Sequence, residues 1–302
     1  MSSSILVLGA GELGDQVLAK LSTHPHRNDF KVALMLRPSA IESQDDAKRA
    51  KIDTYRSLDI DVLPGDLVND DLEHLSSKFK GFHTIISCTG MTFPPGTQLK
   101  IVKSVLQAGA KRYFPWQYGV DYDVIGRGSA QNLFTEQLDV RDLLRSQSAT
   151  EWVIVSTGMF SSFLIEPSFG IINEDRSVVT AIGSWESRIT VTDVSEIGTV
   201  VAEIALACPQ VSGVVHIASD TVSMRRIADV ADEILGKKLE RRLKTVSQLK
   251  EELAAEPDDG MRKYRVVFAE GTGVSWDLDG TFNAKKGIHL KPFTEWAKSN
   301  LH

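Results

Sequence analysis

A glycine-rich turn near the N-terminus is the feature of this sequence that most constrains its fold. Residues 5–8 (Ile-Leu-Val-Leu) are typical of a buried strand, and they run directly into Gly9-Ala10-Gly11-Glu12-Leu13-Gly14. In this spacing Gly9 makes the tight turn, Gly11 lets the backbone approach a pyrophosphate, and Gly14 allows close helix packing. The first-turn amides, from Glu12 and Leu13 onward, then face the pyrophosphate at the positive end of the helix dipole. A turn that binds nothing is the alternative, but its place between a strand and a helix favours a dinucleotide site.

The end of the second expected strand, residues 31–36, indicates which dinucleotide binds. An NAD site usually carries Asp or Glu there to hold the ribose 2′-hydroxyl, whereas this strand ends in Leu36-Arg37-Pro38 and the next carboxylate is Glu42. An arginine can pair with a 2′-phosphate through two hydrogen bonds and stack on adenine. We therefore predict NADP(H), with Arg37 and Lys48 as its phosphate-binding cations. A solvated charge at a strand end, or on a polar helix face, is the alternative for each.

The first half of the chain alternates short apolar runs with helical stretches. Strands are expected at 4–8, 31–36, 60–63, 82–88, 112–115 and 151–156, and helices at 12–21, 43–58, 70–79, 97–108 and 131–145. Near-continuous apolar strands that alternate with helices are typical of a parallel sheet covered on both faces. The expected fold class is thus α/β, a doubly wound (Rossmann) sheet with a smaller, interleaved α/β C-terminal lobe. The expected domains are an NADP(H)-binding domain at 1–156, with a contribution from about 187–218, and a substrate-binding lobe at 157–302.

Charge and composition exclude several classes of function. The net charge is -6 with no basic block, so we expect no nucleic-acid or membrane partner. No apolar run approaches the roughly 20 residues of a membrane span, and the two cysteines, Cys88 and Cys208, form no Cys-x-x-Cys pair. His24 and His26 have no further ligand nearby in the sequence, so no metal site is expected. These features favour a soluble, cytoplasmic protein.

Further short motifs follow in a recognisable order. They are Pro64-Gly65-Asp66-Leu67, Gln98-Leu99-Lys100-Ile101-Val102, Ala110-Lys111-Arg112-Tyr113-Phe114-Pro115-Trp116-Gln117-Tyr118-Gly119-Val120-Asp121 and Thr192-Asp193-Val194-Ser195-Glu196-Ile197-Gly198. With the glycine turn and Arg37, they resemble the NmrA-like, isoflavone reductase-like group of atypical short-chain dehydrogenases/reductases. The resemblance implies an NADP(H) domain, a smaller lobe and a substrate cleft. That group includes reductases of phenolic substrates and also NADP(H)-sensing regulators that catalyse nothing.

The resemblance also assigns roles around the nicotinamide. Thr89 and Gly90, at the end of the fourth strand, would pass its side, and Pro115, Trp116 and Gln117 would form the wall beside it.

Two departures from the family pattern concern the chemistry. The family typically reads Pro-Ser-Glu-Phe-Gly at the wall, and this chain reads Pro-Trp-Gln-Tyr-Gly. The family's reductases also carry a catalytic Lys four residues before an Arg, and alignment on Phe134 and Arg141 places Gln137 there. Glutamine donates and accepts hydrogen bonds but does not titrate, so Gln137 cannot be a general acid or base.

The remaining candidates concern the substrate. Gln137 would hold the substrate's oxygen or nitrogen, and Tyr118 or Tyr122 would supply a proton; packing within the wall is the alternative for both tyrosines. The predicted substrate-binding residues are Trp116, Asp121, Met159 and Phe160, the last two because ligands bind beyond the carboxyl ends of the strands.

The predicted function is that of an NADPH-dependent reductase of a small, aromatic or natural-product-like carbonyl, enone, imine or quinone-type molecule. The alternative is a non-catalytic, NADP(H)-sensing regulator of the NmrA type, which the missing lysine favours.

Overall fold

The computed structural model describes residues 3–90 and 93–301. Two compact units interleave along the chain: unit 1 takes residues 1–117, 139–155 and 197–215, and unit 2 takes residues 118–138, 156–196 and 216–302. The two-domain division expected from the sequence, with its boundary at residue 156, stays a prediction.

A seven-stranded sheet forms the centre of unit 1. In spatial order its strands are β10 (Gly213–His216), β6 (Glu151–Ser156), β5 (Arg112–Phe114), β4 (Thr84–Ser87), β1 (Ser3–Leu8), β2 (Phe30–Leu36) and β3 (Ile60–Pro64). Strand β1 pairs in parallel with both β2 and β4. The order reverses at β1, between β2 and β4, which is typical of doubly wound sheets and marks the crevice where their ligands bind. The predicted Rossmann fold class is confirmed.

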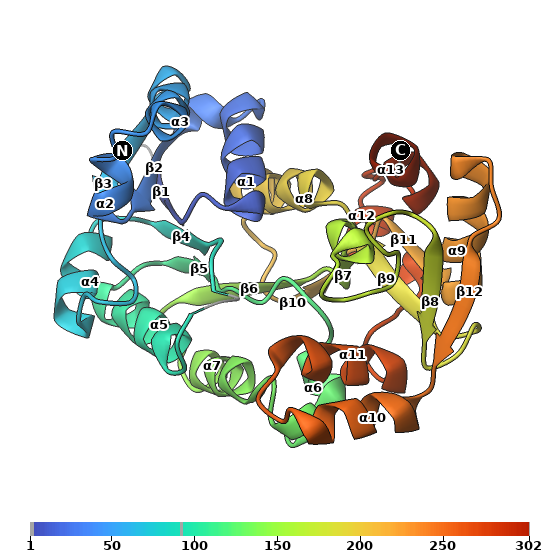
Figure 1. The fold of residues 1–302 in the computed structure, drawn as a ribbon. Helices are drawn as coiled ribbons and strands as arrows, with labels where there is room; N and C mark the ends of the chain where they lie inside the picture. The colour runs from blue at the N-terminus through green and yellow to red at the C-terminus, as the bar shows by residue number, and fades with distance from the viewer. Residues whose placement is uncertain (1–2, 91–92, 302) are drawn as a thin grey trace. The chain divides into compact units, whose positions relative to one another are not determined.

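Helices cover both faces of this sheet. Figure 1 shows α1 (Glu12–Thr23) and α8 (Val194–Ala207) on one side, and α4 (Leu72–Phe79), α5 (Thr97–Ala108) and α7 (Thr135–Arg145) on the other. The short α2 (Pro38–Ile41) and the longer α3 (Asp46–Ser57) connect β2 to β3. Residues 5–8 of β1 are fully buried. That burial explains why the strand is a continuous apolar run rather than an alternating one.

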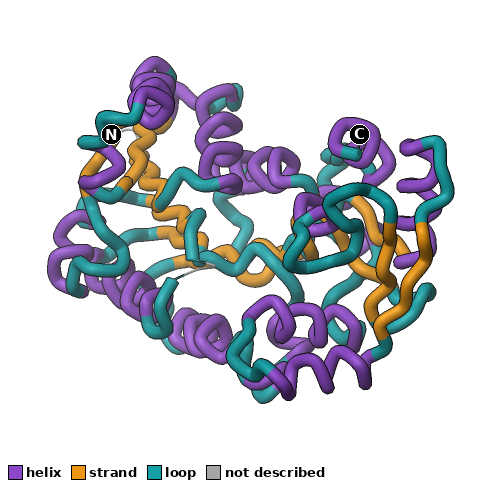
Figure 2. Tube along the Cα trace, in the orientation of Figure 1, coloured by secondary structure: helices purple, strands orange, loops and turns teal. Residues whose placement is uncertain are grey.

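Unit 2 has smaller sheets. One has the order β11 (Asp220–Ser223), β9 (Arg188–Thr192), β7 (Met159–Phe160), and the other pairs β12 (Glu240–Lys244) with β8 (Val178–Ile182), as the orange strands of Figure 2 show. Its helices are α6 (Tyr122–Ile125), α9 (Met224–Leu235), α10 (Val246–Ala255), α11 (Gly260–Glu270), α12 (Phe282–Lys285) and α13 (Phe293–Asn300). An apolar cluster joins most of these elements, including Phe134, Phe169, Phe268 and Trp296.

The helix expected at 131–145 is shorter than the sequence indicates. Residues 129–131 form a separate 3-10 turn, and Asn132 is left-handed with φ 64°. A left-handed residue cannot continue a right-handed helix, so α7 begins at Thr135. The helix expected at 43–58 likewise begins later, at Asp46, because the Asp45 side chain accepts the Lys48 amide and caps it.

Within residues 3–90 and 93–301, no helix combines the length and apolar character needed to span a bilayer. In the same part of the chain, no three His, Cys, Asp or Glu side chains gather as a metal site.

Arg112 of β5 caps the C-terminal end of α8 inside unit 1. Its Nη1 donates to the Ile204 carbonyl at 3.1 Å, and its Nη2 donates to the carbonyls of Cys208 at 3.1 Å and Val211 at 2.6 Å. The residue is only 3% exposed. The last carbonyls of a helix have no partner within the helix and carry its negative dipole end. Arg112 therefore joins α8 to the sheet.

We expect Arg112→Met to lower the free energy of unfolding by about 2–3 kcal/mol, because it leaves buried carbonyls without a donor. Urea unfolding would measure the loss. Lys111→Met is the control, since Lys111 is the exposed neighbour in the sequence. Equal midpoints for the two variants would show that the cap contributes nothing.

Candidate functional site

The predicted glycine turn connects β1 to α1 in a conformation that needs its glycines. Gly9 is left-handed, with φ 87°, and its amide donates to the Met35 carbonyl at 3.2 Å. A Cβ on Gly9 would lie 2.8 Å from Thr89 Cβ, and one on Gly14 would lie 2.2 Å from the Gly9 carbonyl oxygen. These spacings are too short for any side chain. Gly9 and Gly14 thus let β1, α1 and the end of β4 meet.

Gly11 has a different reason to be glycine. A Cβ there would meet nothing within 4 Å, so the space above its backbone is open. Gly11 is the N-cap of α1 and offers no side-chain acceptor to the first-turn amides. An open N-terminus of this kind suits an anion. Leu13 is buried beneath the turn, whereas Glu12 is exposed.

A lysine of α3 lies against the same turn. Lys51 Nζ is 3.0 Å from the Ala10 carbonyl oxygen and 2.5 Å from Asp15 Oδ2, and the Tyr55 hydroxyl donates to Asp15 Oδ1 at 2.5 Å. Lys48, the predicted second cation, is exposed on the same helix. The structure thus brings Lys51 to the turn, and the role of Lys48 stays a prediction.

Arg37 follows β2 and is exposed, as a residue that reads a bound phosphate must be. Its charge reaches Asp66. Burial raises the pKa of Asp66, but hydrogen bonds from Asn69 and from the Val68 amide, together with the charge of Arg37, lower it below its ordinary value. Asp66 is therefore a carboxylate near neutral pH. Within the described residues, no ion pair of the Arg37 guanidinium is found.

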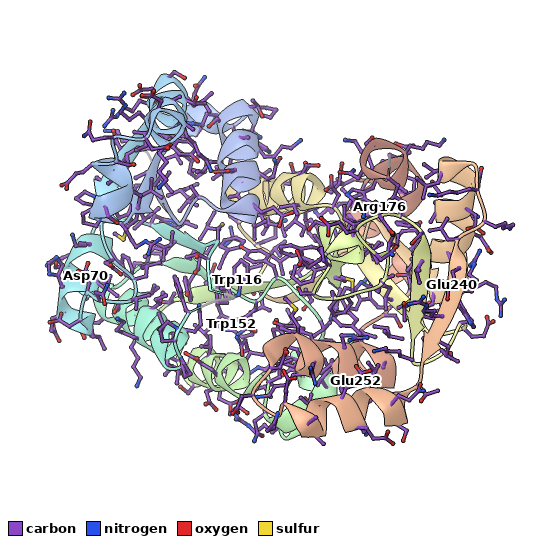
Figure 3. The ribbon with its side chains drawn as sticks, viewed as in Figure 1. Asp70, Trp116, Trp152, Arg176, Glu240 and Glu252 are labelled. Carbon is purple, nitrogen blue, oxygen red and sulfur yellow. The ribbon has the colours of Figure 1, made fainter. Side chains whose placement is uncertain are left out.

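The two segments predicted to flank the nicotinamide meet in unit 1. A Cβ on Gly90 would lie 2.5 Å from Trp116 Cδ1 and 2.1 Å from Gln98 Nε2. Trp116 therefore lies directly against the backbone beyond β4, and Figure 3 shows its side chain on the segment beyond β5. Trp116 is half-buried and Pro115 is buried. Gln98 Nε2 also donates to the Thr89 carbonyl at 3.4 Å, which steadies the predicted Thr89-Gly90 edge.

Gln117 is buried against an arginine. The Arg141 side chain is 0% exposed, and its Nε donates to Gln117 Oε1 at 2.7 Å, where Gln117 is 1% exposed. This contact fixes the wall residue to α7. A buried side chain at position 117 is well placed to support its neighbours and poorly placed to touch a ligand itself, and its cofactor contact stays a prediction.

The predicted proton donors of unit 2, Tyr118 and Tyr122, are each 6% exposed. The Tyr122 ring lies 4.6 Å from that of Phe134. A Cβ on Gly119 would be 2.7 Å from the Tyr122 hydroxyl oxygen, so this hydroxyl lies against the Gly119 backbone. The packing alternative accounts for these contacts, and a catalytic role for either tyrosine stays a prediction.

Asp121 makes two kinds of contact within unit 2. Its side chain accepts the amides of Asp123 and Val124 and so caps α6. Its Oδ2 is 2.9 Å from Nε2 of His216. A substrate role for Asp121 would have to coexist with both contacts.

The other predicted substrate and catalytic residues differ in exposure. Met159 is buried, at 3%, and Phe160 is half-buried, on the short strand β7. Gln137 is half-buried in the first turn of α7, four residues before Arg141. Residues four apart lie on the same face of a helix, so Gln137 and Arg141 share one.

Sequence reasoning missed His216 as a functional candidate. It stands 95 residues from Asp121 in the chain, and no local motif links the two. Sequence reasoning also chose Lys48 rather than Lys51 as the second cation, but Lys51, three residues later and nearly one helical turn away on α3, is the lysine that reaches the glycine turn.

The NmrA-like family model matches residues 1–292. An NmrA-like family domain-containing oxidoreductase of Gibberella moniliformis is 45% identical over 300 residues, which cover 99% of this chain and 98% of that protein. Among solved structures, an isoflavone reductase has a TM-score of 0.81 at 19% identity, with 99% of each chain covered. A complex of leucoanthocyanidin reductase with NADPH from Vitis vinifera has a TM-score of 0.80 at 16% identity, also with 99% of each chain covered.

Alanine substitutions at Gly14 and Gly11 test the geometry of the glycine turn, and they should differ in their effect on stability. We expect Gly14→Ala to destabilise the protein by about 1–3 kcal/mol, because its methyl group must displace the Gly9 carbonyl. Gly11→Ala should change the free energy of unfolding by less than about 1 kcal/mol, because its methyl group enters open space. Urea unfolding of both variants without ligand is the measurement. A larger loss for Gly11→Ala would contradict the open geometry above this residue.

Proposed function

Because this chain belongs to the NmrA-like family, we propose that it is an NADPH-dependent reductase of a small, aromatic or natural-product-like carbonyl, enone, imine or quinone-type molecule. The observation that carries the proposal is the glycine turn, where Gly9 and Gly14 leave no room for side chains and Gly11 leaves α1 open to a pyrophosphate. The relative from Gibberella moniliformis is named an oxidoreductase, and the leucoanthocyanidin reductase structure contains NADPH. Both support the proposal.

The residues of unit 1 fit NADP(H) group by group. The first-turn amides at Glu12, Leu13 and Gly14 would hold the pyrophosphate at the positive end of α1. Arg37 binds the 2′-phosphate, with Lys48 or Lys51 of α3 as a second cation. On the nicotinamide side, the backbone of Thr89 and Gly90 and the wall of Pro115 and Trp116 would hold the ring, with Gln117 supporting the wall through Arg141.

The chain's own residues then act on the substrate. NADPH, when bound, supplies the hydride. Reduction of a carbonyl places negative charge on the substrate's oxygen, and a hydrogen-bond donor aimed at that oxygen lowers the barrier. The Gln137 amide is such a donor, but it has no proton to give up. Asp121, Met159, Phe160 and Trp116 are the proposed substrate contacts, and Tyr118 or Tyr122 the local proton donors.

Gln137 also favours a second candidate, a non-catalytic NADP(H)-sensing regulator of the NmrA type. Without a titratable side chain at that position of α7, the cofactor would bind and report its redox state to a partner. The opposing observation is Trp116, which packs closely on Gly90 and keeps the nicotinamide wall aromatic.

NADPH oxidation distinguishes the two candidates. The protein is mixed with NADPH and a panel of aromatic aldehydes, enones, imines and quinones, and loss of NADPH absorbance is followed. Turnover with at least one acceptor is the expected result. Tight NADPH binding without turnover on any acceptor would reject the reductase and favour the sensor.

We expect Arg37→Ala to weaken NADPH binding about 10- to 100-fold, while NADH binding changes little, because only NADPH carries the 2′-phosphate. Titration calorimetry with both cofactors measures the difference. Arg49→Ala is the matched control, since the Arg49 guanidinium pairs with Asp46 on α3. If Arg37→Ala weakened both cofactors equally, Arg37 would not read the phosphate.

Gln137→Ala should lower kcat by about 100-fold and spare NADPH affinity, because the amide serves the substrate's oxygen rather than the cofactor. Gln137→Glu keeps the shape of the side chain but replaces its donor with an acceptor, so a comparable fall in kcat is expected. Steady-state kinetics and NADPH titration give the two quantities. Full turnover in either variant would remove Gln137 from the mechanism.

A further inference from the structure

His216 forms an ordered pair with Asp121 in unit 2, and the roles proposed so far leave this histidine unused. Nε2 of His216, the last residue of β10, lies 2.9 Å from Asp121 Oδ2, and the two side chains are 32% and 17% exposed. Because an ionised carboxylate only accepts hydrogen bonds, this contact keeps a proton on Nε2. Within residues 3–90 and 93–301, Nδ1 of His216 has no hydrogen-bond partner. The nitrogen that can exchange a proton is thus Nδ1.

Further contacts with neighbouring residues hold both His216 and Asp121 in place. The His216 ring meets the Trp276 ring edge-on, with centroids 4.9 Å apart, and Trp276 Nε1 donates to the Ile217 carbonyl at 3.2 Å. The Asp121 amide donates to the Gly273 carbonyl at 2.8 Å, while its carboxylate also caps α6. The imidazole is therefore fixed in position rather than free to rotate.

The pair belongs to the same part of unit 2 as the proposed substrate contacts. Two residues before Asp121, the Gly119 carbonyl accepts the amides of Thr157 at 2.9 Å and Gly158 at 3.0 Å, and β7 with Phe160 begins at the next residue. The Ile217 amide, next to His216, donates to the Ser156 carbonyl at 2.9 Å. Backbone hydrogen bonds thus place His216 and Phe160 on adjoining segments.

We propose that His216, held by Asp121, is the group that binds the substrate's oxygen and supplies its proton. The inference rests on the proposed reductase function. Asp121 is then a positioning residue, which sets the tautomer and orientation of the ring. This assignment supplies the titratable side chain that Gln137 cannot be, and the buried hydroxyls of Tyr118 and Tyr122 are no longer needed as donors.

The step balances with one hydride and one proton. NADPH, when bound, would supply the hydride for the new C–H bond at the carbonyl carbon, and the π electron pair of the C=O bond would move onto oxygen. That oxygen takes the proton from Nδ1 of the His216 imidazolium, which becomes neutral imidazole and regains a proton from water. Asp121 keeps its own charge throughout.

The step also predicts a dependence on pH. A step that needs a proton on the imidazole becomes slower as protons become scarcer, so turnover should fall toward alkaline pH. The segments that meet His216 carry Asp121, the N-cap of α6, as well as Asp123 in α6 and Asp277 next to Trp276. All three are carboxylates, and His216 is the proton donor that the proposed step uses.

His216→Gln is the decisive variant, because the Gln amide can still donate a hydrogen bond to Asp121 but cannot act as an acid or a base. The first measurement needs no turnover. The NADP⁺-bound protein is titrated with 4-nitrophenol at pH 6, where a phenol that transfers its proton to Nδ1 shows its coloured phenolate. The wild-type protein should show the phenolate band, and His216→Gln should lose it with an affinity at least about tenfold lower.

Asp121→Asn keeps a side-chain acceptor for the α6 amides but turns an amide N–H toward Nε2, which moves the ring proton to Nδ1. We expect it to weaken the phenolate band while the urea midpoint stays near that of the wild type. His289→Gln, at an exposed histidine of unit 2, is the control and should behave as the wild type. An unchanged band in His216→Gln, or no band in the wild type, would overturn the assignment.

The second measurement is the pH profile of kcat/KM with any acceptor that is turned over. His216→Gln should lower kcat at pH 7 by about 100-fold and abolish the fall toward alkaline pH, with NADPH affinity unchanged. If His216→Gln kept the wild-type kcat and the wild-type pH profile of kcat/KM, the role of His216 would be overturned and the reductase function would stand. The opposite outcome is also possible: the phenolate band is present in the wild type and lost in His216→Gln, but the wild type oxidises no NADPH with any acceptor. That outcome would keep His216 as the oxygen-binding group and reject the reductase function.

Discussion

The approach of α1 to the turn after β1 is the constraint on which the nucleotide-binding half of the chain depends. The position of a Gly14 Cβ lies 2.2 Å from the Gly9 carbonyl oxygen, so the helix can reach the turn only because that atom is missing. The same turn brings Gly9 within contact of Thr89, beyond β4. Gly90 in turn receives the Trp116 indole. The ends of three strands thus meet where glycine has no side chain, and the open N-terminal end of α1 lies among them.

Much of this fold could be predicted from the sequence because its signals are local. Strands buried on both faces are continuous apolar runs, and the glycine spacing is fixed by a single turn. The boundary of α7 was wrong for an equally local reason: Asn132 adopts a left-handed conformation, which asparagine tolerates but does not require. Residue type alone therefore does not determine where that helix starts.

The side-chain pairs of the candidate site could not be predicted, because they join distant parts of the chain. Gln117 and Arg141 are 24 residues apart, and Asp121 and His216 are 95 apart. Taken alone in the sequence, each of these residues indicates only an ordinary structural role: a wall residue for Gln117, a helix charge for Arg141, a turn former for Asp121 and a surface residue for His216. Their chemistry arises only when the fold sets one beside the other. A buried arginine with an amide partner, and an imidazole with a carboxylate partner, are properties of pairs.

The Gln117–Arg141 contact also relates the two departures from the family pattern, Gln117 and Gln137, to each other. The family pattern has an acid at the position of Gln117 and a base at that of Gln137, one helical turn from the buried Arg141. Changing only the base would leave Arg141 facing a carboxylate, and changing only the acid would leave two cations on one face of α7. Changing both keeps the formal charge of the set constant. Gln117 Oε1 accepts the Arg141 Nε–H at 2.7 Å, so the amide at position 117 still gives the buried guanidinium a hydrogen-bond acceptor where the family pattern has a carboxylate.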